Sequence, residues 1–385
     1  MQNTLTQQLS EAFNTNESEV FISIYLRIRK ATKGLEWQKL HFKQLVEQAE
    51  KKFKQQFTDK EWQLFNDEFQ EVLSDSTFWD QHLGQSVGIF TNSQKLVVVD
   101  LKHIEIEQVH VSDLPAILPL VADEQVYPTV DILALQNKTF AYYKVRDGII
   151  TEMAFPDNAP TTLTKALGSE KTDRMVNFNA SPSGGSRNHG ATFHGHSSAD
   201  DEREVDQTNF FRAVSKYLQQ HEDIDQNIPV VLFAEPRQQA VYREVSKSQR
   251  ISEALSIDKS PAKLTLAEVR DAVSVIQTQW QALRTQSLTA QYDKAVGQQL
   301  VLDRIDTMIE PATNGQIRTL YVSPDSRFEG YFTADQEGQF TIVDQLQDDI
   351  IEKISDIVWQ QGGDIEVVAL QAIQSQSPAV AILRY

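Results

Sequence analysis

The chain of 385 residues contains no cysteine, which excludes disulfide scaffolds, thiolate metal sites and cysteine nucleophiles. We therefore expect a reducing compartment, the cytoplasm. There is no Gly-Lys dipeptide, so the chain cannot form a Walker-type phosphate-binding loop. The patterns G-x-G-x-x-G, G-x-S-x-G and H-E-x-x-H are absent as well. These absences give no indication of a bound cofactor or of a stand-alone enzyme.

Long apolar runs are also scarce. The most apolar stretch, residues 114–122, is short and contains two prolines, so we expect no membrane-spanning helix. The first nineteen residues lack a basic region followed by an apolar one, which differs from a secretory signal. The formal charge of −18 disfavours nonspecific binding to nucleic acid, and neither a membrane nor DNA is an expected partner.

The apolar fraction of 40% is sufficient for packed cores, and the length suggests two or three domains. Residues 20–28 form a β-branched and aromatic run that predicts a strand. Apolar side chains at helical spacing predict an amphipathic helix at 35–57, followed by a second helix at 59–74. Three further strands are expected, at 87–92, 95–101 and 104–111.

The middle of the chain begins with a predicted β-meander. Two strand-like runs flank a turn at Gln136 and Asn137, and a third follows Asp147 and Gly148. A helix is expected at 205–220. Residues 228–235 are a continuous apolar run, which is typical of a strand buried on both faces. These elements predict an α/β middle domain.

Towards the C-terminus, the pattern changes to alternating helices and strands. A long helix is expected from 264 to 296, with Gly297 as its C-terminal cap. Helices are then predicted at 298–310 and 347–361. Strands are predicted at 317–323, 365–370 and 379–385. This alternation indicates a further α/β domain, built as a layered sandwich.

One segment has an unusual composition. Residues 184–196 contain four of the fifteen glycines and three of the eight histidines, and an acidic run follows. The spacing of His189, His194 and His196 matches no established metal geometry, and glycines would leave such ligands poorly preorganised. Two interpretations stay open: an exposed loop without chemistry, or a loop that orders against a partner by meeting phosphates or bases. Ser198 is expected to cap the next helix.

A second feature is a local excess of positive charge. Residues 27–60 contain ten lysines and arginines against four acidic residues, although the whole chain is acidic. A basic edge on an acidic protein can orient it on RNA through phosphate contacts. The simpler alternative is a solvated helix face.

In the order of its parts, the chain resembles the archaeo-eukaryotic class I release factors and their relative Pelota, specifically the bacterial branch of that family. Within this branch it looks most like a factor that acts in ribosome hibernation. The stretches that carry the resemblance are residues 20–28, 74–92, 130–145, 206–218, 228–246 and 295–323.

The resemblance implies a mixed α/β fold in three domains. These are a degenerate N-terminal α/β domain at 1–128, an RNase H-like middle domain at 129–262 with a Gly/His loop at 179–205, and a C-terminal α/β sandwich at 263–385, similar to kink-turn-binding ribosomal proteins. Members of the family enter the ribosomal A site like a tRNA, with the middle-domain loop directed at the peptidyl-transferase centre. The C-terminal domain contacts a translational GTPase, in bacteria elongation factor Tu. The implied partners are therefore the ribosome, through its rRNA, and elongation factor Tu.

The chain departs from the release factors at the tip of this loop. There they carry a Gly-Gly-Gln tripeptide that positions water at the peptidyl ester, whereas this loop has no glutamine between Asn179 and Asp206. We therefore expect no catalytic residue and no metal ligand. The residues expected to contact rRNA are, in the loop, Gly184, Gly185, Ser186, Arg187, Asn188, His189, His194 and His196, and, on the basic N-terminal face, Lys43, Lys51, Lys52 and Lys54.

Three other hypotheses stay open. The chain could rescue ribosomes by peptidyl-tRNA hydrolysis, with His194 or His196 in place of the glutamine. It could be a metal-dependent nuclease, which requires clustered carboxylates on the sheet. Asp131, Asp147 and Glu152 are the acidic residues of the meander, and their spacing does not favour such a site. Finally, the partner could be another protein, with no ribosomal role.

Overall fold

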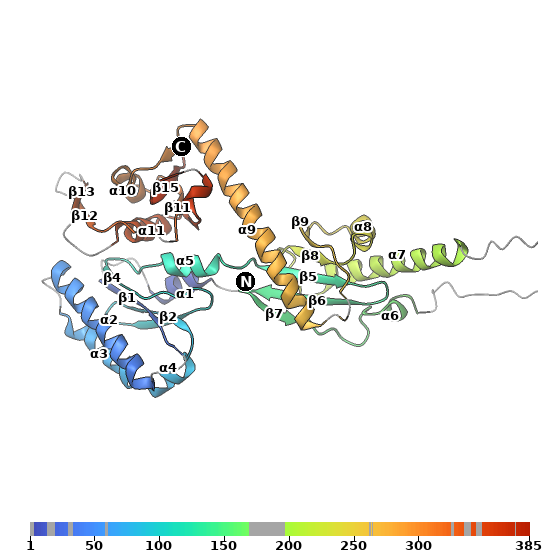
Figure 1. Cartoon of the computed structure of the whole chain (residues 1–385), viewed down its shortest axis with the longest axis horizontal. Coiled ribbons are helices and arrows are strands. Elements are labelled where there is room, and N and C mark those ends of the chain that lie inside the picture. Colours follow the sequence, from blue (N-terminus) through green and yellow to red (C-terminus); the bar gives the residue numbers. More distant parts are fainter. Residues whose placement is uncertain are drawn as a thin grey trace, which may run out of the picture. The chain divides into compact units, whose positions relative to one another are not determined.

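The computed structural model describes residues 4–13, 20–29, 34–57, 61–168, 197–261, 263, 265–324, 327–334, 340–343, 349–373 and 375–385. Its contacts divide the chain into two compact units (Figure 1). The discontinuous unit consists of Met1–Val126 and Arg284–Tyr385, and the inserted unit consists of Tyr127–Leu283. The mixed α/β fold predicted from the sequence is confirmed.

The N-terminal part of the discontinuous unit is an antiparallel sheet with strand order β3-β2-β1-β4. Its strands are β1 (Phe21–Arg27), β2 (Ser86–Thr91), β3 (Leu96–Leu101) and β4 (Gln108–Ser112). Its helices are α1 (Leu5–Ala12), α2 (Gly34–Gln56), α3 (Gln63–Ser74), α4 (Ser76–Gln81) and α5 (Leu118–Glu124). Because side chains alternate along β1, one face packs on α2, α3 and α4 and the other on α1 and α5. In the last predicted strand, residues 104–107 are not extended into the sheet.

The C-terminal part of the discontinuous unit is a sheet with strand order β10-β15-β11-β14, in which β11 and β14 are parallel. Its strands are β10 (Val301–Leu302), β11 (Ile317–Val322), β14 (Asp364–Val367) and β15 (Ala379–Leu383), and a separate hairpin contains β12 (Tyr331–Ala334) and β13 (Phe340–Val343). Its helices are α10 (Ile305–Thr313), α11 (Ile350–Gln360) and the 3₁₀ turn η2 (Leu370–Ile373).

One helix prediction in this part needs correction. The helix expected at 298–310 begins only at Ile305. Val301 and Leu302 instead pair with β15, and the backbone of Arg304 is extended at φ −116°. Pairing with a distant strand therefore overrides the local helical spacing.

The two parts of the discontinuous unit share a hydrophobic core, with buried side chains from α1, β1 and α5 and from α10, α11, β11 and β15. Two carboxylates of α11 hold the start of α5. Glu352 Oε1 accepts a hydrogen bond from the Leu118 N–H at 2.7 Å, and Asp356 Oδ1 accepts one from the Ile117 N–H at 3.0 Å. Both carboxylates are at least 96% buried. They satisfy amides that a helix start leaves unpaired, and their charge suits the positive end of the helix dipole.

Gln125, directly after α5, joins the same two parts at strand β14. Its Nε2 donates to the Ile365 carbonyl at 2.8 Å, and its Oε1 accepts from the Val367 N–H at 2.8 Å. Arg284 donates to the same Oε1 at 2.5 Å and pairs with Glu366. The chain leaves the discontinuous unit after Val126 and re-enters it at Arg284. The side-chain amide of Gln125 thus connects these two places.

The inserted unit contains a five-stranded sheet with order β7-β6-β5-β8-β9, antiparallel from β7 to β5 and parallel from β5 to β9. Its strands are β5 (Val130–Leu135), β6 (Phe140–Arg146), β7 (Ile149–Glu152), β8 (Val230–Phe233) and β9 (Ile251–Ile257). Its helices are α6 (Leu163–Leu167), α7 (Ser197–Gln220), α8 (Pro236–Val245) and the first half of α9 (Leu266–Gly297). The predicted meander forms the antiparallel half of this sheet.

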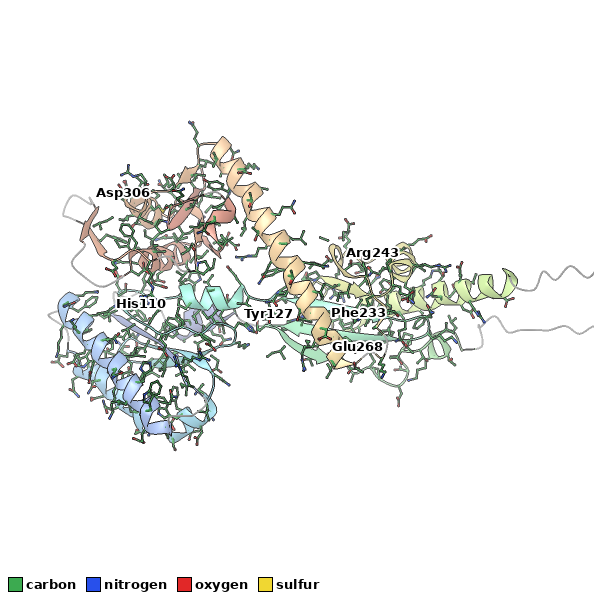
Figure 2. All side chains as sticks on the ribbon, in the orientation of Figure 1. His110, Tyr127, Phe233, Arg243, Glu268 and Asp306 are labelled. Carbon is green, nitrogen blue, oxygen red and sulfur yellow. The ribbon has the colours of Figure 1, made fainter. Side chains whose placement is uncertain are left out.

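Helices cover both faces of this sheet. One face packs on α6, α7 and α8, and the other packs on α9. In Figure 2, Arg243 marks α8 and Phe233 marks a strand residue that faces α9. The turn between β6 and β7 has left-handed residues, Asp147 at φ 48° and Gly148 at φ 67°, as a tight hairpin requires. No helix in the described part of the chain is long and apolar enough to cross a membrane.

We predict that Asp356→Ala destabilises the discontinuous unit by about 1.5–3 kcal/mol, because the Ile117 amide loses its charged acceptor. Asp356→Asn should cost less, since an amide oxygen can still accept. Asp364→Ala, an exposed acid-to-alanine control, should stay within about 0.5 kcal/mol of the wild type. Calorimetry of the full chain measures all three. Equal stability of the Asp356→Ala and Asp364→Ala variants would contradict the capping role.

Candidate functional site

The predicted Gly/His loop lies between two helices of the inserted unit. Helix α6 ends at Leu167, and α7 begins at Ser197. Residues 184–196, with all eight loop residues expected to contact rRNA, lie outside the described residues. The expected loop end at 205 is wrong, because 197–205 already form the first turns of α7. Ser198 consequently lies inside the helix instead of preceding it.

The two helices that border the loop belong to one core. Leu163 and Leu167 of α6 are buried together with Phe210 and Phe211 of α7. The predicted apolar face of the second helix, Phe210, Phe211, Val214 and Leu218, is thus confirmed. The shared core thus includes the last residue of α6 on one side of the loop, and on the other side it begins at Phe210 of α7.

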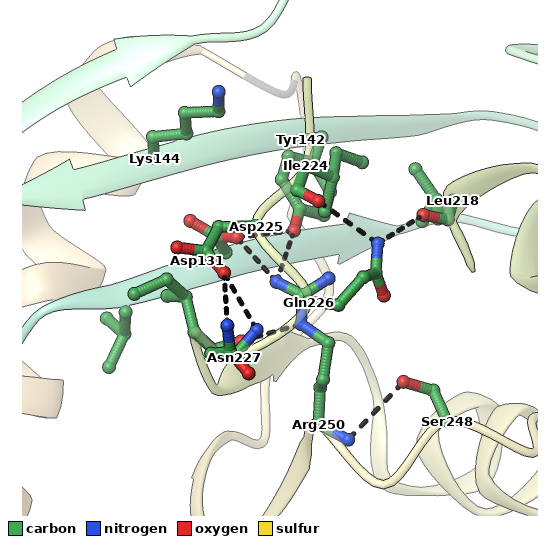
Figure 3. A network of polar contacts seen from close by, with 12 residues as sticks. Asp131, Tyr142, Lys144, Leu218, Ile224, Asp225, Gln226, Asn227, Ser248 and Arg250 are labelled. Carbon is green, nitrogen blue, oxygen red and sulfur yellow. Dashed lines mark hydrogen bonds and ion pairs between the residues drawn. The ribbon is translucent and has the colours of Figure 1, made fainter. Parts of the chain in front are cut away.

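Under this scaffold lies a fully buried carboxylate, Asp131 of β5 (Figure 3). Its Oδ1 accepts a hydrogen bond from Arg146 Nη2 at 2.8 Å. Its Oδ2 accepts bonds from Arg250 Nη2 at 2.7 Å and from the Tyr142 hydroxyl at 2.6 Å. The two guanidinium groups compensate a charge that burial alone would strongly disfavour.

The two arginines that pair with Asp131 are also held by backbone carbonyls. Arg146 Nη1 donates to the carbonyls of Val130 and Val145, and Arg250 Nε donates to the carbonyl of Ile228 at 2.7 Å. Burial, reinforced by the adjacent carboxylate, raises the pKa of Tyr142 well above its usual value. Tyr142 is therefore a neutral hydroxyl donor at physiological pH. The network holds β5, β6 and the segment before β9 in register.

This geometry bears on the nuclease hypothesis. Asp131 is enclosed by two arginines, Asp147 lies in the β6–β7 turn, and Glu152 is exposed on β7. Within the described ranges, no group of three His, Asp or Glu side chains is placed to hold a metal ion. The arrangement of these described carboxylates therefore does not favour two-metal chemistry.

The basic N-terminal face is carried by α2. Lys43 and Lys51 are exposed there. Lys52 is half-buried and donates to the Val109 carbonyl at 2.8 Å, while Lys54 pairs with Glu50 at 2.5 Å. Lys43, Lys51 and Lys54 are thus exposed, Lys54 within an ion pair on the helix surface, whereas Lys52 is directed at the protein.

The structure also reduces the positive charge counted along the sequence. Arg27 pairs with Glu105, and Arg29 lies 3.6 Å from Glu107. These glutamates follow β3, far from residues 27–60 in the chain. Among the four lysines expected to contact rRNA, Lys43 and Lys51 are the exposed ones for which the structure gives no ion pair.

Sequence reasoning missed the partners of Asp131 and also α8, which completes the covered face of the sheet. One signal was present: an aspartate in a strand whose neighbouring residues are all apolar requires a compensating cation. The sequence alone could not identify which arginines provide it.

Residues 129–279 match the sequence model of bacterial archaeo-eukaryotic release factor family 6. The matched residues nearly coincide with the inserted unit, Tyr127–Leu283, which is thus similar to the bacterial archaeo-eukaryotic release factors. The family that the resemblance indicates is thereby confirmed. A comparison with curated proteins finds no match.

Among solved structures, the chain is similar to ribosome-bound archaeal Pelota, in a structure with ABCE1, at 10% identity and a TM-score of 0.39, over 100% of this chain and 94% of that one. Pelota from Archaeoglobus fulgidus is 9% identical, with a TM-score of 0.35, over 78% and 80%. Dom34 from S. cerevisiae, a translation termination-like factor that interacts with Hbs1, is 8% identical, with a TM-score of 0.35, over 78% and 80%. Structural similarity at these identities and TM-scores does not assign a function to this chain.

We predict that Asp131→Ala destabilises the inserted unit by about 3–5 kcal/mol, because two guanidinium groups lose their shared carboxylate. Tyr142→Phe removes one hydrogen bond to the same oxygen and should cost about 1 kcal/mol. Calorimetry of the full chain, with hydrogen exchange of β5 to assign the transition, measures both. A cost for Asp131→Ala no larger than that for Tyr142→Phe would contradict the proposed role of the ion pairs.

Proposed function

We propose that this chain is a ribosome-binding translation factor that occupies the A site and reaches the peptidyl-transferase centre without hydrolysing peptidyl-tRNA. The proposal is carried by a release-factor family match at 129–279 in a chain that has no Gly-Gly-Gln tripeptide. The corresponding loop has Gly184, Gly185 and Ser186 instead. A protein that keeps the scaffold and lacks the glutamine would fill the site without cleaving the ester.

We further propose that the factor acts in ribosome hibernation, as part of a stress response in the cytoplasm, together with elongation factor Tu. The chain has no phosphate-binding loop, so GTP chemistry would come from a partner. In this proposal, residues 1–128 bind rRNA through the basic face of α2, residues 129–262 present the Gly/His loop, and residues 263–385 contact the GTPase.

The alternative function is ribosome rescue by peptidyl-tRNA hydrolysis, with a loop histidine in place of glutamine. An imidazole near neutral pH can position or activate water, and the loop contains three histidines. A peptide-release assay on stalled ribosomal complexes separates the two functions.

We predict that reversing the charges of Lys43 and Lys51 to glutamate weakens co-sedimentation with vacant ribosomes. The salt dependence should become shallower by roughly 0.7–0.9 per lost phosphate contact. The matched control reverses Lys247 and Lys259, two exposed lysines of the inserted unit, and changes the net charge equally. An unchanged salt slope after the α2 reversal would assign this face to solvent. Failure of the wild-type chain to co-sediment at low salt would exclude the proposed function.

We predict that deleting residues 182–196 leaves the thermal transitions of both units unchanged and reduces protection of the peptidyl-transferase centre. The wild-type chain should release no peptide above background, because no glutamine is present to position water. Release by the wild type that is lost in His194→Ala or His196→Ala would instead establish the rescue hydrolase.

A further inference from the structure

The turn between β5 and β6 contacts both helices that border the Gly/His loop. The Lys138 carbonyl accepts a hydrogen bond from the Leu163 N–H at 2.8 Å, at the first residue of α6. The neighbouring Asn137 Oδ1 accepts one from Gln207 Nε2 at 2.8 Å, on α7. Adjacent residues of one turn thus hold the upstream and the downstream helix.

Asn137 also connects α7 to α8. Its Oδ1 accepts a second hydrogen bond from Gln238 Nε2 at 2.7 Å, and Gln238 is only 6% exposed. A carbonyl oxygen has two acceptor positions, and both are used here. The turn is itself held by the Gln136 N–H donating to the Thr139 carbonyl and by the Thr139 hydroxyl donating to Gln136 Oε1. The Asn137 oxygen therefore has a defined position.

The first half of α7 has little apolar packing, so the hydrogen bond from Gln207 to the exposed Asn137 is one of the few described contacts that link it to the sheet. The buried apolar residues of α7 begin at Phe210, and none of residues 202–209 is buried. The ion pair between Glu204 and Arg237 is exposed on both sides, and exposed pairs contribute little. Gln207 and the buried Gln238 of α8 both donate to the Asn137 oxygen, so this oxygen links the first half of α7 to α8.

We propose that Asn137 is a positioning residue that sets the direction in which the first half of α7 leaves the inserted unit. The inference rests on the proposed function, because that direction determines where the chain leaves the Gly/His loop. Ser197 lies ten residues from Gln207, or about 15 Å along the helix. A tilt of about 20° at Gln207 would therefore move Ser197 by roughly 5 Å. Such a displacement matters for a segment that must reach a defined site.

Hydrogen exchange of the full chain tests this role in solution, with three variants of the same turn. Asn137→Ala should accelerate amide exchange at 202–208 about tenfold and leave 210–218 unchanged. Asn137→Asp keeps an oxygen that accepts both bonds and should restore the wild-type rates. Lys138→Ala, whose contact to α6 is made by the backbone, is the matched control and should behave like the wild type.

Either of two exchange results would overturn the inference: unchanged rates at 202–208 in Asn137→Ala, or equal acceleration at 210–218, which indicates general destabilisation. A second measurement uses vacant ribosomes. Asn137→Ala should still co-sediment but lose protection of peptidyl-transferase nucleotides, and Asn137→Asp should recover it. Full protection by Asn137→Ala overturns the positioning role. Failure of the wild type to co-sediment overturns the proposed function, whereas the exchange result still decides the role of Asn137 in α7.

Discussion

Asp131 imposes the constraint on which the inserted unit depends, because a carboxylate without solvent exposure must be compensated where it lies. Arg146 comes from the next strand, and Arg250 comes from the segment that leads into β9. These three side chains link β5 to β6 and to the segment before β9, so the network stabilises the register of the sheet on which α6, α7 and α8 pack. Both guanidinium groups are engaged by the same carboxylate. Asp131 therefore has a structural role, linking β5 to β6 and to the segment before β9 in the five-stranded sheet.

This rigid sheet gives the neighbouring polar contacts a defined reference. The β5–β6 turn, held by its own hydrogen bonds, presents Asn137 to α7 and α8 and a backbone carbonyl to α6. The chain that enters and leaves the Gly/His loop thus starts from fixed positions. In our proposal, this scaffold delivers a loop that occupies a site, and the missing glutamine removes the hydrolytic chemistry.

Local patterns predict many of the helices and strands, and long-range strand pairing explains why α10 starts later than predicted. The apolar runs of β5 and β8 and the helical spacing of α7 identify those elements directly. Helix α8 escapes prediction because two of the residues it buries are glutamines, Gln238 and Gln239. The partners of Asp131 and of Arg27 could not be predicted from the sequence, because they are distant in the chain. Arg250 is 119 residues from Asp131, and Glu105 reduces a positive charge that a window count assigns to Arg27.

The central claim is that the chain occupies the ribosomal A site with its Gly/His loop at the peptidyl-transferase centre. Cryo-electron microscopy of the full chain bound to vacant ribosomes from the same cell tests it most directly. The account predicts density for the inserted unit in the A site, with the segment between α6 and α7 extending into the peptidyl-transferase centre. Density elsewhere on the ribosome, or a loop directed away from that centre, would contradict it.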